Sequence, residues 1–488
     1  MSALQLHATG LSSATLHIRA EVSRGKNFSL SSEGGEDRGE EVRCERTGRA
    51  ARQTGRFASP FRELLLATGV LLSAALVPAF AEGLRAGTAR IDITPEKPVT
   101  LAGYASRTNL SRGVHDPLSA RATAFEQDGK RLVLVSLDIL GFYNGTAEPL
   151  RQAILDECRL QPSDLFLCAI HTHSAPTPTL DPAKGHSNNV EYTRTLQSKL
   201  VKLAREAVDH MVPVQLGVGS GASPVGVNRR EVVRDNAGNT RIVLGRNPAL
   251  PIDREVQVLK LTRSDRNELA VVLFAYATHS TALGPRNLLV SGDVHGLAAQ
   301  FIERHLGASV VAPPFAGASG NIDPWYRVLP EFNTTNSWVP EPVLLGTLLG
   351  EEVVHVLKGI QKSVTNGVIK SAIKTVALPG KPRGETTTGG ASMTTPLALT
   401  VACVGDVAFV GLGGEIFTEI GQAIKAASPF PRTIILTHCN GAAGYLPIRS
   451  AYPEGGYEVQ SSPFGLGADE QVIEEAKRML VELRGKQE

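Results

Sequence analysis

Two histidines and one glutamate each stand where an apolar run of the sequence ends. His171 follows the run DLFLCAI, His279 closes ELAVVLFAYATH, and Glu415 closes DVAFVGLGGE. Open α/β sheets place their ligands beyond the carboxyl ends of such buried strands. Two histidines with one carboxylate form a set that holds hydrolytic zinc and leaves one position open for water. The pattern therefore predicts a zinc-dependent hydrolase.

Each of these residues also fits an ordinary structural role. In the motif HTHSAP (171–176), His171 and His173 project to the same side of an extended chain, so one can bind a metal while the other contacts substrate or supports a ligand. The same motif fits two hydrogen-bonded structural histidines. His279 alone fits a satisfied core histidine. Glu415 fits a carboxylate at a helix N-terminus, where the helix dipole favours negative charge.

The elements that position these residues alternate between strands and helices. Residues 131–140 and 164–170 are continuous apolar runs, and the segment between them carries an apolar face at helical spacing. This order predicts a βαβ unit. Further strands are expected at 268–279, 406–415 and 432–441, and a closing amphipathic helix at 468–486. We expect an α/β fold with a mixed, largely parallel sheet flanked by helices.

Composition excludes several functional classes. The 488 residues include 50 Lys and Arg against 48 Asp and Glu, for a net charge of +2, so no strong field attracts nucleic acid or anionic lipid. The five cysteines form no CxxC pair, which argues against a cysteine zinc site. They are too few for a disulfide framework, and a single disulfide between two of the four cysteines after Cys44 stays an open alternative. We expect a small-molecule or lipid substrate and no nucleic-acid partner.

The N-terminal region carries a targeting signal. Residues 64–77 form an apolar stretch that is too short to span a bilayer comfortably, with Arg56 and Arg62 before it and Ala81 at an A-x-A cleavage site. This predicts a signal peptide at 56–81, export to the periplasm or the extracellular space, and no membrane span after cleavage. A buried helix is the alternative. Residues 1–55 are expected to be a disordered leader or to precede the true start, and 84–488 to form one hydrolase domain.

Several motifs together resemble the neutral (alkaline, non-lysosomal) ceramidases. HTHSAP is similar to the HTHSGP motif of that family, and TARIDITPEKPVTLAGYASR (88–107), GVHDPLSARATAF (113–125), VNRR (227–230) and SGDVHG (291–296) follow in the family's order. The resemblance implies the catalytic-domain fold of that family, without its immunoglobulin-like C-terminal domain. It also implies a zinc ion held by His171, His279, Glu415 and Tyr445.

The resemblance implies roles for four further residues. His173, Arg229 and Tyr457 would polarise the scissile carbonyl and hold the developing oxyanion. The stretch GNIDP (320–324) stands where the family has GDVSP, so Asp323 replaces a serine. Asp323 fits either a general base acting on metal-activated water or a turn-capping residue before Pro324.

The function implied is that of an exported zinc-dependent hydrolase of a linear amide bond. N-acylsphingosine or another N-acyl compound would be the substrate, which would place the enzyme in sphingolipid metabolism. Two alternatives remain open. One is a secreted metal-binding protein without turnover, and the other is a zinc esterase or amidase that acts on a substrate other than ceramide.

Overall fold

The computed structural model describes residues 83–327, 339–381 and 393–485. The predicted leader and the predicted signal peptide at 56–81 lie outside these ranges. Among the described residues, no helix is long and apolar enough to cross a membrane.

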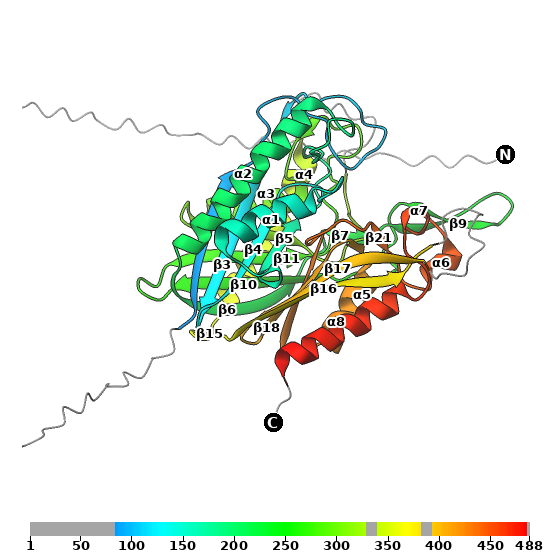
Figure 1. Ribbon diagram of the computed structural model, residues 1–488. Coiled ribbons are helices and arrows are strands. Elements are labelled where there is room, and N and C mark those ends of the chain that lie inside the picture. The colour runs from blue at the N-terminus through cyan, green and yellow to red at the C-terminus, as the bar shows by residue number, and fades with distance from the viewer. Residues whose placement is uncertain (1–82, 328–338, 382–392, 486–488) are drawn as a thin grey trace, which may run out of the picture. The chain divides into compact units, whose positions relative to one another are not determined.

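A nine-stranded sheet forms the first layer of strands (Figure 1). Its strands, in spatial order, are β13 (Pro314–Ala316), β11 (Leu269–Tyr276), β10 (Glu255–Arg263), β6 (Val212–Ala222), β1 (Arg85–Asp92), β3 (Ser119–Gln127), β4 (Lys130–Leu137) and β5 (Leu165–Ala169), with β15 (Ser363–Val364) paired to β6. Along β4, Val133 and Val135 face one side while Leu132 and Leu134 face the other, and all four are buried. Both faces of this sheet are therefore covered, which explains its continuous apolar runs.

The mixed α/β class with helices flanking a mixed sheet is confirmed, but the expectation of a largely parallel sheet is wrong. Only β4–β5 and β11–β13 pair in parallel within the nine-stranded sheet, and its other pairs are antiparallel. For β3 and β4 the physical reason is a short connection: β3 returns as β4 through Asp128 and Gly129, both at positive φ. Two-residue turns join antiparallel neighbours. The predicted βαβ unit is confirmed as β4, α1 (Ala147–Cys158) and β5.

A second sheet packs against the first. It contains β16 (Ile369–Pro379), β17 (Thr394–Val404), β18 (Val407–Leu412) and β20 (Arg432–Thr437). Phe125 and Leu132 of the first sheet share one apolar cluster with Phe409 and Ile434 of the second. The opposite face of the second sheet packs against α5 (Thr418–Ala427) and α8 (Ala468–Arg484). The predicted closing helix is confirmed as α8.

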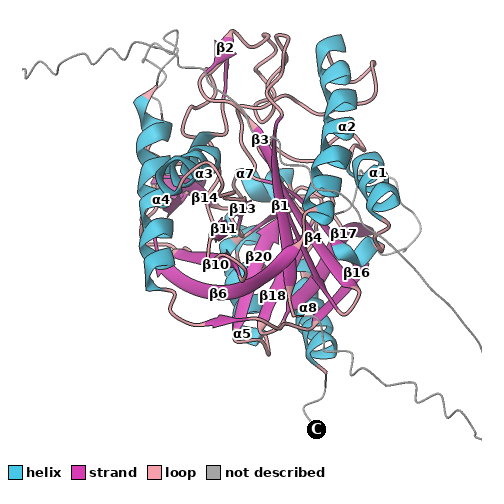
Figure 2. Cartoon of the chain, turned by 90° about the vertical axis from the view of Figure 1, so that its left-hand side faces the viewer, coloured by secondary structure: helices cyan, strands magenta, loops and turns pink. Residues whose placement is uncertain are grey.

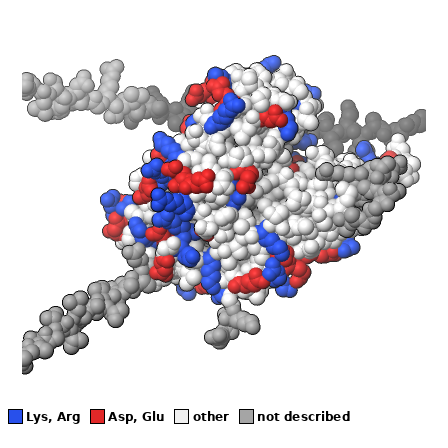
Figure 3. Space-filling model, viewed as in Figure 1, with Lys and Arg blue, Asp and Glu red and all other residues white. Residues whose placement is uncertain are grey.

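The outer face of the nine-stranded sheet is covered by four helices (Figures 1 and 2). They are α1, α2 (Ser187–Asp209), α3 (Asp293–Leu306) and α4 (Pro340–Gly359). The backbone of α2 approaches β1 closely, since a Cβ atom built on Gly87 would lie 2.1 Å from the Ala207 carbonyl oxygen. The resulting order of layers is helix, sheet, sheet, helix. On the face drawn in Figure 3, Lys and Arg side chains are interspersed with Asp and Glu.

Short strand pairs beyond the main strands bring distant loops together. They are β7 (Gly226–Asn228) with β14 (Ile322–Pro324), β19 (Glu415–Ile416) with β21 (Tyr445–Leu446), β2 (Gly113–Val114) with β12 (Leu289–Val290), and β8 (Arg230–Arg234) with β9 (Thr240–Leu244). The short helices η1 (Pro162–Asp164), α6 (Ala451–Glu454) and α7 (Tyr457–Ser461) complete the loops. Two of these pairs, β7–β14 and β19–β21, carry predicted site residues.

Candidate metal centre

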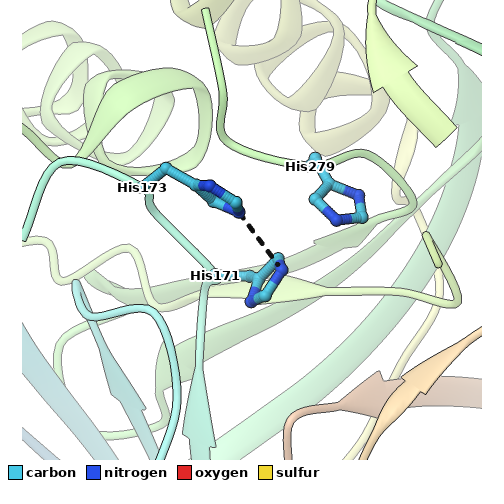
Figure 4. A group of neighbouring side chains, drawn as sticks. All are labelled: His171, His173 and His279. Carbon is cyan, nitrogen blue, oxygen red and sulfur yellow. Dashed lines mark hydrogen bonds between the residues drawn. The ribbon is translucent and has the colours of Figure 1, made fainter. Parts of the chain in front are cut away.

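The three histidines predicted from the sequence lie together beyond the ends of β5 and β11 (Figure 4). A parallel bridge between Thr172 and Ser280 joins the two segments, and the backbone N–H of His173 donates to the Ser280 carbonyl at 3.1 Å. The Nε2 atoms of His171 and His173 are 3.4 Å apart. The prediction that His171 and His173 lie on an extended chain is wrong, because His171 has a φ of 61°. Such a conformation in a non-glycine residue is costly and tends to occur at functional sites.

Backbone carbonyls fix the tautomers of His171 and His279. The Nδ1 atom of His171 lies 2.8 Å from the Leu140 carbonyl, and that of His279 lies 2.8 Å from the Ser319 carbonyl and 2.9 Å from that of Ile322. A carbonyl only accepts, so each Nδ1 carries a proton, and in the neutral ring Nε2 then keeps its lone pair. Burial and the nearby Arg229 lower the pKa of His279, which keeps this ring neutral. Metal-binding histidines are oriented in this way.

Glu415 faces both free lone pairs. Its Oε2 atom lies 3.3 Å from Nε2 of His171 and 3.5 Å from Nε2 of His279, and it has no hydrogen-bond partner although it is buried. The strand pair β19–β21 aligns Glu415 with Tyr445, and the Tyr143 hydroxyl donates to the other carboxylate oxygen at 3.3 Å. Three acceptor atoms that face each other in a buried place fit a bound cation, which removes their mutual repulsion.

Arg229 is the cationic group that contacts these acceptors in the structure. Its Nη1 atom lies 3.2 Å from Nε2 of His279, and its Nη2 atom donates to the Tyr445 hydroxyl at 3.1 Å. The lone pair of His279 Nε2 serves one partner at a time, so a metal bound to His279 requires Arg229 to give up this contact. The donor set of His171, His279, Glu415 and Tyr445 fits a metal ion under that condition.

Two carboxylates hold Arg229 in place. Glu458 is fully buried and accepts from Arg229 Nε at 2.7 Å, and Asp323 accepts from Arg229 Nη1 at 3.2 Å. Arg246 donates to the second oxygen of Asp323, also at 3.2 Å. Burial raises the pKa of Asp323, but the charges of Arg229 and Arg246 outweigh it and leave the pKa below its ordinary value. Asp323 is therefore an ionised member of a charge network.

The other predicted substrate contacts, His173 and Tyr457, differ in their exposure. Burial, followed by the neighbouring His171, lowers the pKa of His173 well below its usual value, so this ring is neutral. Gly103 packs directly on it, since a Cβ there would lie 2.2 Å from His173 Nδ1. The Tyr457 ring contacts the Tyr445 ring edge to face at 5.6 Å and is 47% exposed. Tyr457 is thus the member of the set most accessible to a substrate.

Sequence reasoning missed several residues of this site, Glu458 among them. His438 is buried and stacks on His171 with ring centroids 3.9 Å apart. It ends the apolar run of β20, and this signal, already used for His171 and His279, would have found it. Tyr143 and Arg246 lie in loops and carry no pattern that distinguishes them from other surface residues.

Comparison with known proteins identifies the family. Residues 84–321 match the family model described as neutral/alkaline non-lysosomal ceramidase, N-terminal. Residues 84–321, just under half of the chain, thus belong to the neutral/alkaline ceramidase family. His171, Arg229 and His279 lie inside the matched residues, whereas Asp323, Glu415, Tyr445 and Tyr457 lie beyond them.

Members of this family from distant organisms share the same region. A neutral ceramidase of Oryza sativa is 28% identical over 254 residues, which cover 49% of this chain and 31% of that protein. A neutral ceramidase of Mycobacterium tuberculosis is 28% identical over 260 residues, which cover 49% of this chain and 39% of that protein. The match thus spans about a third of the length of these ceramidases.

Solved ceramidase structures share the fold. The neutral ceramidase of Pseudomonas aeruginosa superposes with a TM-score of 0.65 at 20% identity, over 82% of this chain and 74% of that one. A structure described as ceramidase complexed with C2 gives a TM-score of 0.67 at 19% identity. This likeness extends over more of the chain than the family model does.

Proposed function

We propose that this protein is an exported, zinc-dependent hydrolase that cleaves the amide bond of an N-acyl lipid of the ceramide type. The observation that carries the proposal is the convergence of two Nε2 lone pairs on the unpartnered, buried Oε2 of Glu415. Membership of the ceramidase family supports the amide as the bond that is cleaved. The signal-peptide pattern at 56–81 supports export.

The protein supplies the ligands and the groups around them. The zinc ion would be held by His171, His279, Glu415 and Tyr445. These residues offer two imidazole nitrogens, one carboxylate and one phenol oxygen, and nitrogen and carboxylate ligands suit zinc. When bound, zinc lowers the pKa of water to about 7 and polarises a carbonyl as a Lewis acid. The carbonyls of Leu140, Ser319 and Ile322 keep the histidine ligands in the required tautomer.

The remaining residues would bind and orient the substrate. His173 and Tyr457 would donate to the oxygen of the scissile carbonyl. Arg229, once released from His279, would add a cationic donor next to Tyr445. A hollow of about 580 Å³, partly lined by Trp325, Tyr326 and Leu344, reaches Arg246 beside Asp323 and offers apolar surface for an acyl chain.

The test combines metal content with hydrolysis. The full chain is purified, its zinc is counted, and release of amine from a fluorescent N-acylsphingosine is followed. We expect one zinc per chain and measurable hydrolysis, and we expect a variant with both His171→Ala and His279→Ala to lose both. His355→Ala, an exposed histidine on α4, is the matched control and keeps both.

Two outcomes would contradict parts of the proposal. Retained zinc and activity in the double variant would rule out this centre. Zinc without hydrolysis of any N-acyl substrate would favour the alternative of a metal-binding protein without turnover, which one observation already supports: Asp323 and Glu458 neutralise Arg229. Cleavage of a matched ester without any cleavage of the amide would instead indicate a zinc esterase.

A further inference from the structure

Two cysteines face each other beneath the histidine cluster. Cys168 in β5 and Cys439, just after β20, form an isolated antiparallel bridge. The flanking hydrogen bonds run from Asn440 N to the Leu167 carbonyl at 2.9 Å and from Ala169 N to the His438 carbonyl at 3.3 Å. The two cysteines therefore occupy a non-hydrogen-bonded pair, in which Cα atoms lie about 4.5 Å apart. Disulfides require a Cα separation of roughly 4.4–6.8 Å.

The surroundings hold this pair in register. The side chain of Asn440 donates to the Leu165 carbonyl at 2.9 Å and accepts from Leu167 N at 3.0 Å, so it fixes the alignment of the two segments. The sulfur of Cys439 lies above Gly411, where a Cβ atom would come within 2.5 Å of it. Burial raises the pKa of the Cys168 thiol well above its usual value, and a hydrogen bond with Cys439 contributes to the same direction.

The other two described cysteines have no such partner. Cys158 ends α1 in the core between the helices and the nine-stranded sheet, and Cys403 in β17 belongs to the core under α5 and α8. Cys168 and Cys439 share a third apolar cluster, which contains neither Cys158 nor Cys403. Among the described cysteines, the bridge pair is thus the one arranged for cross-linking.

We propose that Cys168 and Cys439 form a disulfide when the chain folds in the presence of a disulfide oxidant. The two thiols lose two protons and two electrons as the S–S bond forms, and the oxidant, such as oxidised glutathione, is reduced to two thiols. Both sulfurs are buried, with residue exposures of 1% and 0%, so exchange occurs while the chain folds rather than afterwards. The cross-link joins the two sheets.

This cross-link bears on the candidate metal centre. Cys168 precedes His171 by three residues, and Cys439 follows His438, whose ring stacks on that of His171 at 3.9 Å. The disulfide fixes these two segments against each other and closes a long loop, which restricts the unfolded chain strongly. The proposal concerns sulfur chemistry alone and stands independently of the proposed enzymatic function.

The experiment counts thiols after folding. The full chain is folded with oxidised glutathione or with dithiothreitol, and is then unfolded and labelled with N-ethylmaleimide. Mass spectrometry gives the number of labels on each chain. Of the five cysteines in the sequence, we expect three to be labelled after oxidative folding and five after reductive folding. A peptide map should show residues 168 and 439 linked, and the guanidinium midpoint should be higher for the oxidised form and fall after reduction.

Matched variants separate this pair from the others. Replacing Cys158 and Cys403 together by Ser should leave the loss of two labels unchanged, whereas Cys168→Ser should abolish it. Five labels after oxidative folding, or a link that includes Cys158 or Cys403, would overturn the proposal. If Cys168→Ser does not fold, the peptide map of the unaltered chain decides by itself.

Discussion

Asp323 determines how much positive charge Arg229 presents to a substrate. The carboxylate contacts both Arg229 and Arg246, and its pKa is below the ordinary value, so it stays ionised at neutral pH. A carboxyl group of this kind is a poor proton donor and a weak base. We infer that Asp323 positions Arg229, rather than acting as a general base, which was one of the two roles expected from the sequence.

Asp323→Asn tests this role. The amide keeps an oxygen acceptor for one guanidinium but loses the negative charge, so we expect kcat/KM for an N-acyl substrate to fall about tenfold or less, with an unchanged pH profile. General acid or base catalysis typically contributes about 10²–10⁴-fold. A loss of that size, together with the disappearance of one limb of the pH profile, would show that Asp323 transfers a proton.

Glu415→Gln tests the ligand set. The amide has nearly the same shape but no negative charge, so it should reduce zinc affinity by more than about 100-fold, a larger loss than that typical of supporting residues. Competition with a fluorescent chelator measures the change. Glu419→Gln is the control, because Glu419 accepts a hydrogen bond from Asn321 and does not face the histidines. Equal affinity in both variants would remove Glu415 from the site.

Residue patterns predicted part of this site. Histidines that end apolar runs predicted His171 and His279, because strand ends meet at one edge of a fold. The positive φ of His171 and the contact of Arg246 with Asp323 depend on loops that fold against distant segments. Tyr445 was predicted from the family resemblance, since a tyrosine after a glycine gives no signal of its own.

At the scale of elements, the contact between α2 and β1 depends on a missing side chain. Gly87→Ala would place a Cβ atom 2.1 Å from the Ala207 carbonyl and 2.9 Å from the Met211 nitrogen, both backbone atoms that cannot rotate away. We expect the free energy of unfolding to fall by about 3 kcal/mol, measured by guanidinium titration. Gly359→Ala, where a Cβ meets nothing within 4 Å, should change it by less than about 1 kcal/mol. Similar values for both would show that α2 adjusts freely.

Ion pairs of Glu303 join α3 to strands β1 and β3. Glu303 accepts from Arg121 Nε at 2.8 Å and also contacts Arg90. Burial raises the pKa of Glu303, but Arg121 and Arg90 outweigh it and lower the pKa below 4.5. The stabilisation is therefore present above the unfolded pKa and is lost as pH falls through the folded value.

Glu303→Gln should accordingly destabilise the protein at pH 7 by about 3 kcal/mol, because it leaves buried Arg121 with Asp138 alone. The difference from the unaltered protein should shrink as pH falls below 4.5. Denaturant titrations of both proteins from pH 7 to pH 3 measure it. A difference that stays constant with pH would mean that shape, not charge, is responsible. Glu474→Gln on α8, whose partner Lys477 is solvent-exposed, is the control.

At the scale of the whole molecule, the two sheets share one core. Phe409 of β18 packs into the cluster that contains Phe125 and Phe166 of the nine-stranded sheet. Phe409→Ala should lower the free energy of unfolding by about 3–5 kcal/mol, and hydrogen exchange should report the same loss for amides of β4 and β18. Val368→Ala, at 59% exposure, is the control. Loss confined to β18 would show that the sheets unfold separately.

Sequence periodicity predicted the strands and helices better than their arrangement. The run 131–140 is buried on both sides because helices cover one face and a second sheet covers the other. A parallel α/β sheet produces the same run, so the pattern did not distinguish the two architectures. The direction of strand pairing depends on turns such as Asp128–Gly129, and the apolar runs carry no information about these turns.

The order of the segments along the chain also sets when the centre is completed during biosynthesis. His171 and His279 are translated with the nine-stranded sheet, whereas Glu415 and Tyr445 follow only with the four-stranded sheet. A nascent chain that has reached residue 400 therefore presents histidines without the carboxylate that faces them. The candidate metal centre is therefore completed at a late stage of synthesis, and a nonsense codon between residues 280 and 414 yields a product that retains both histidines but lacks Glu415 and Tyr445.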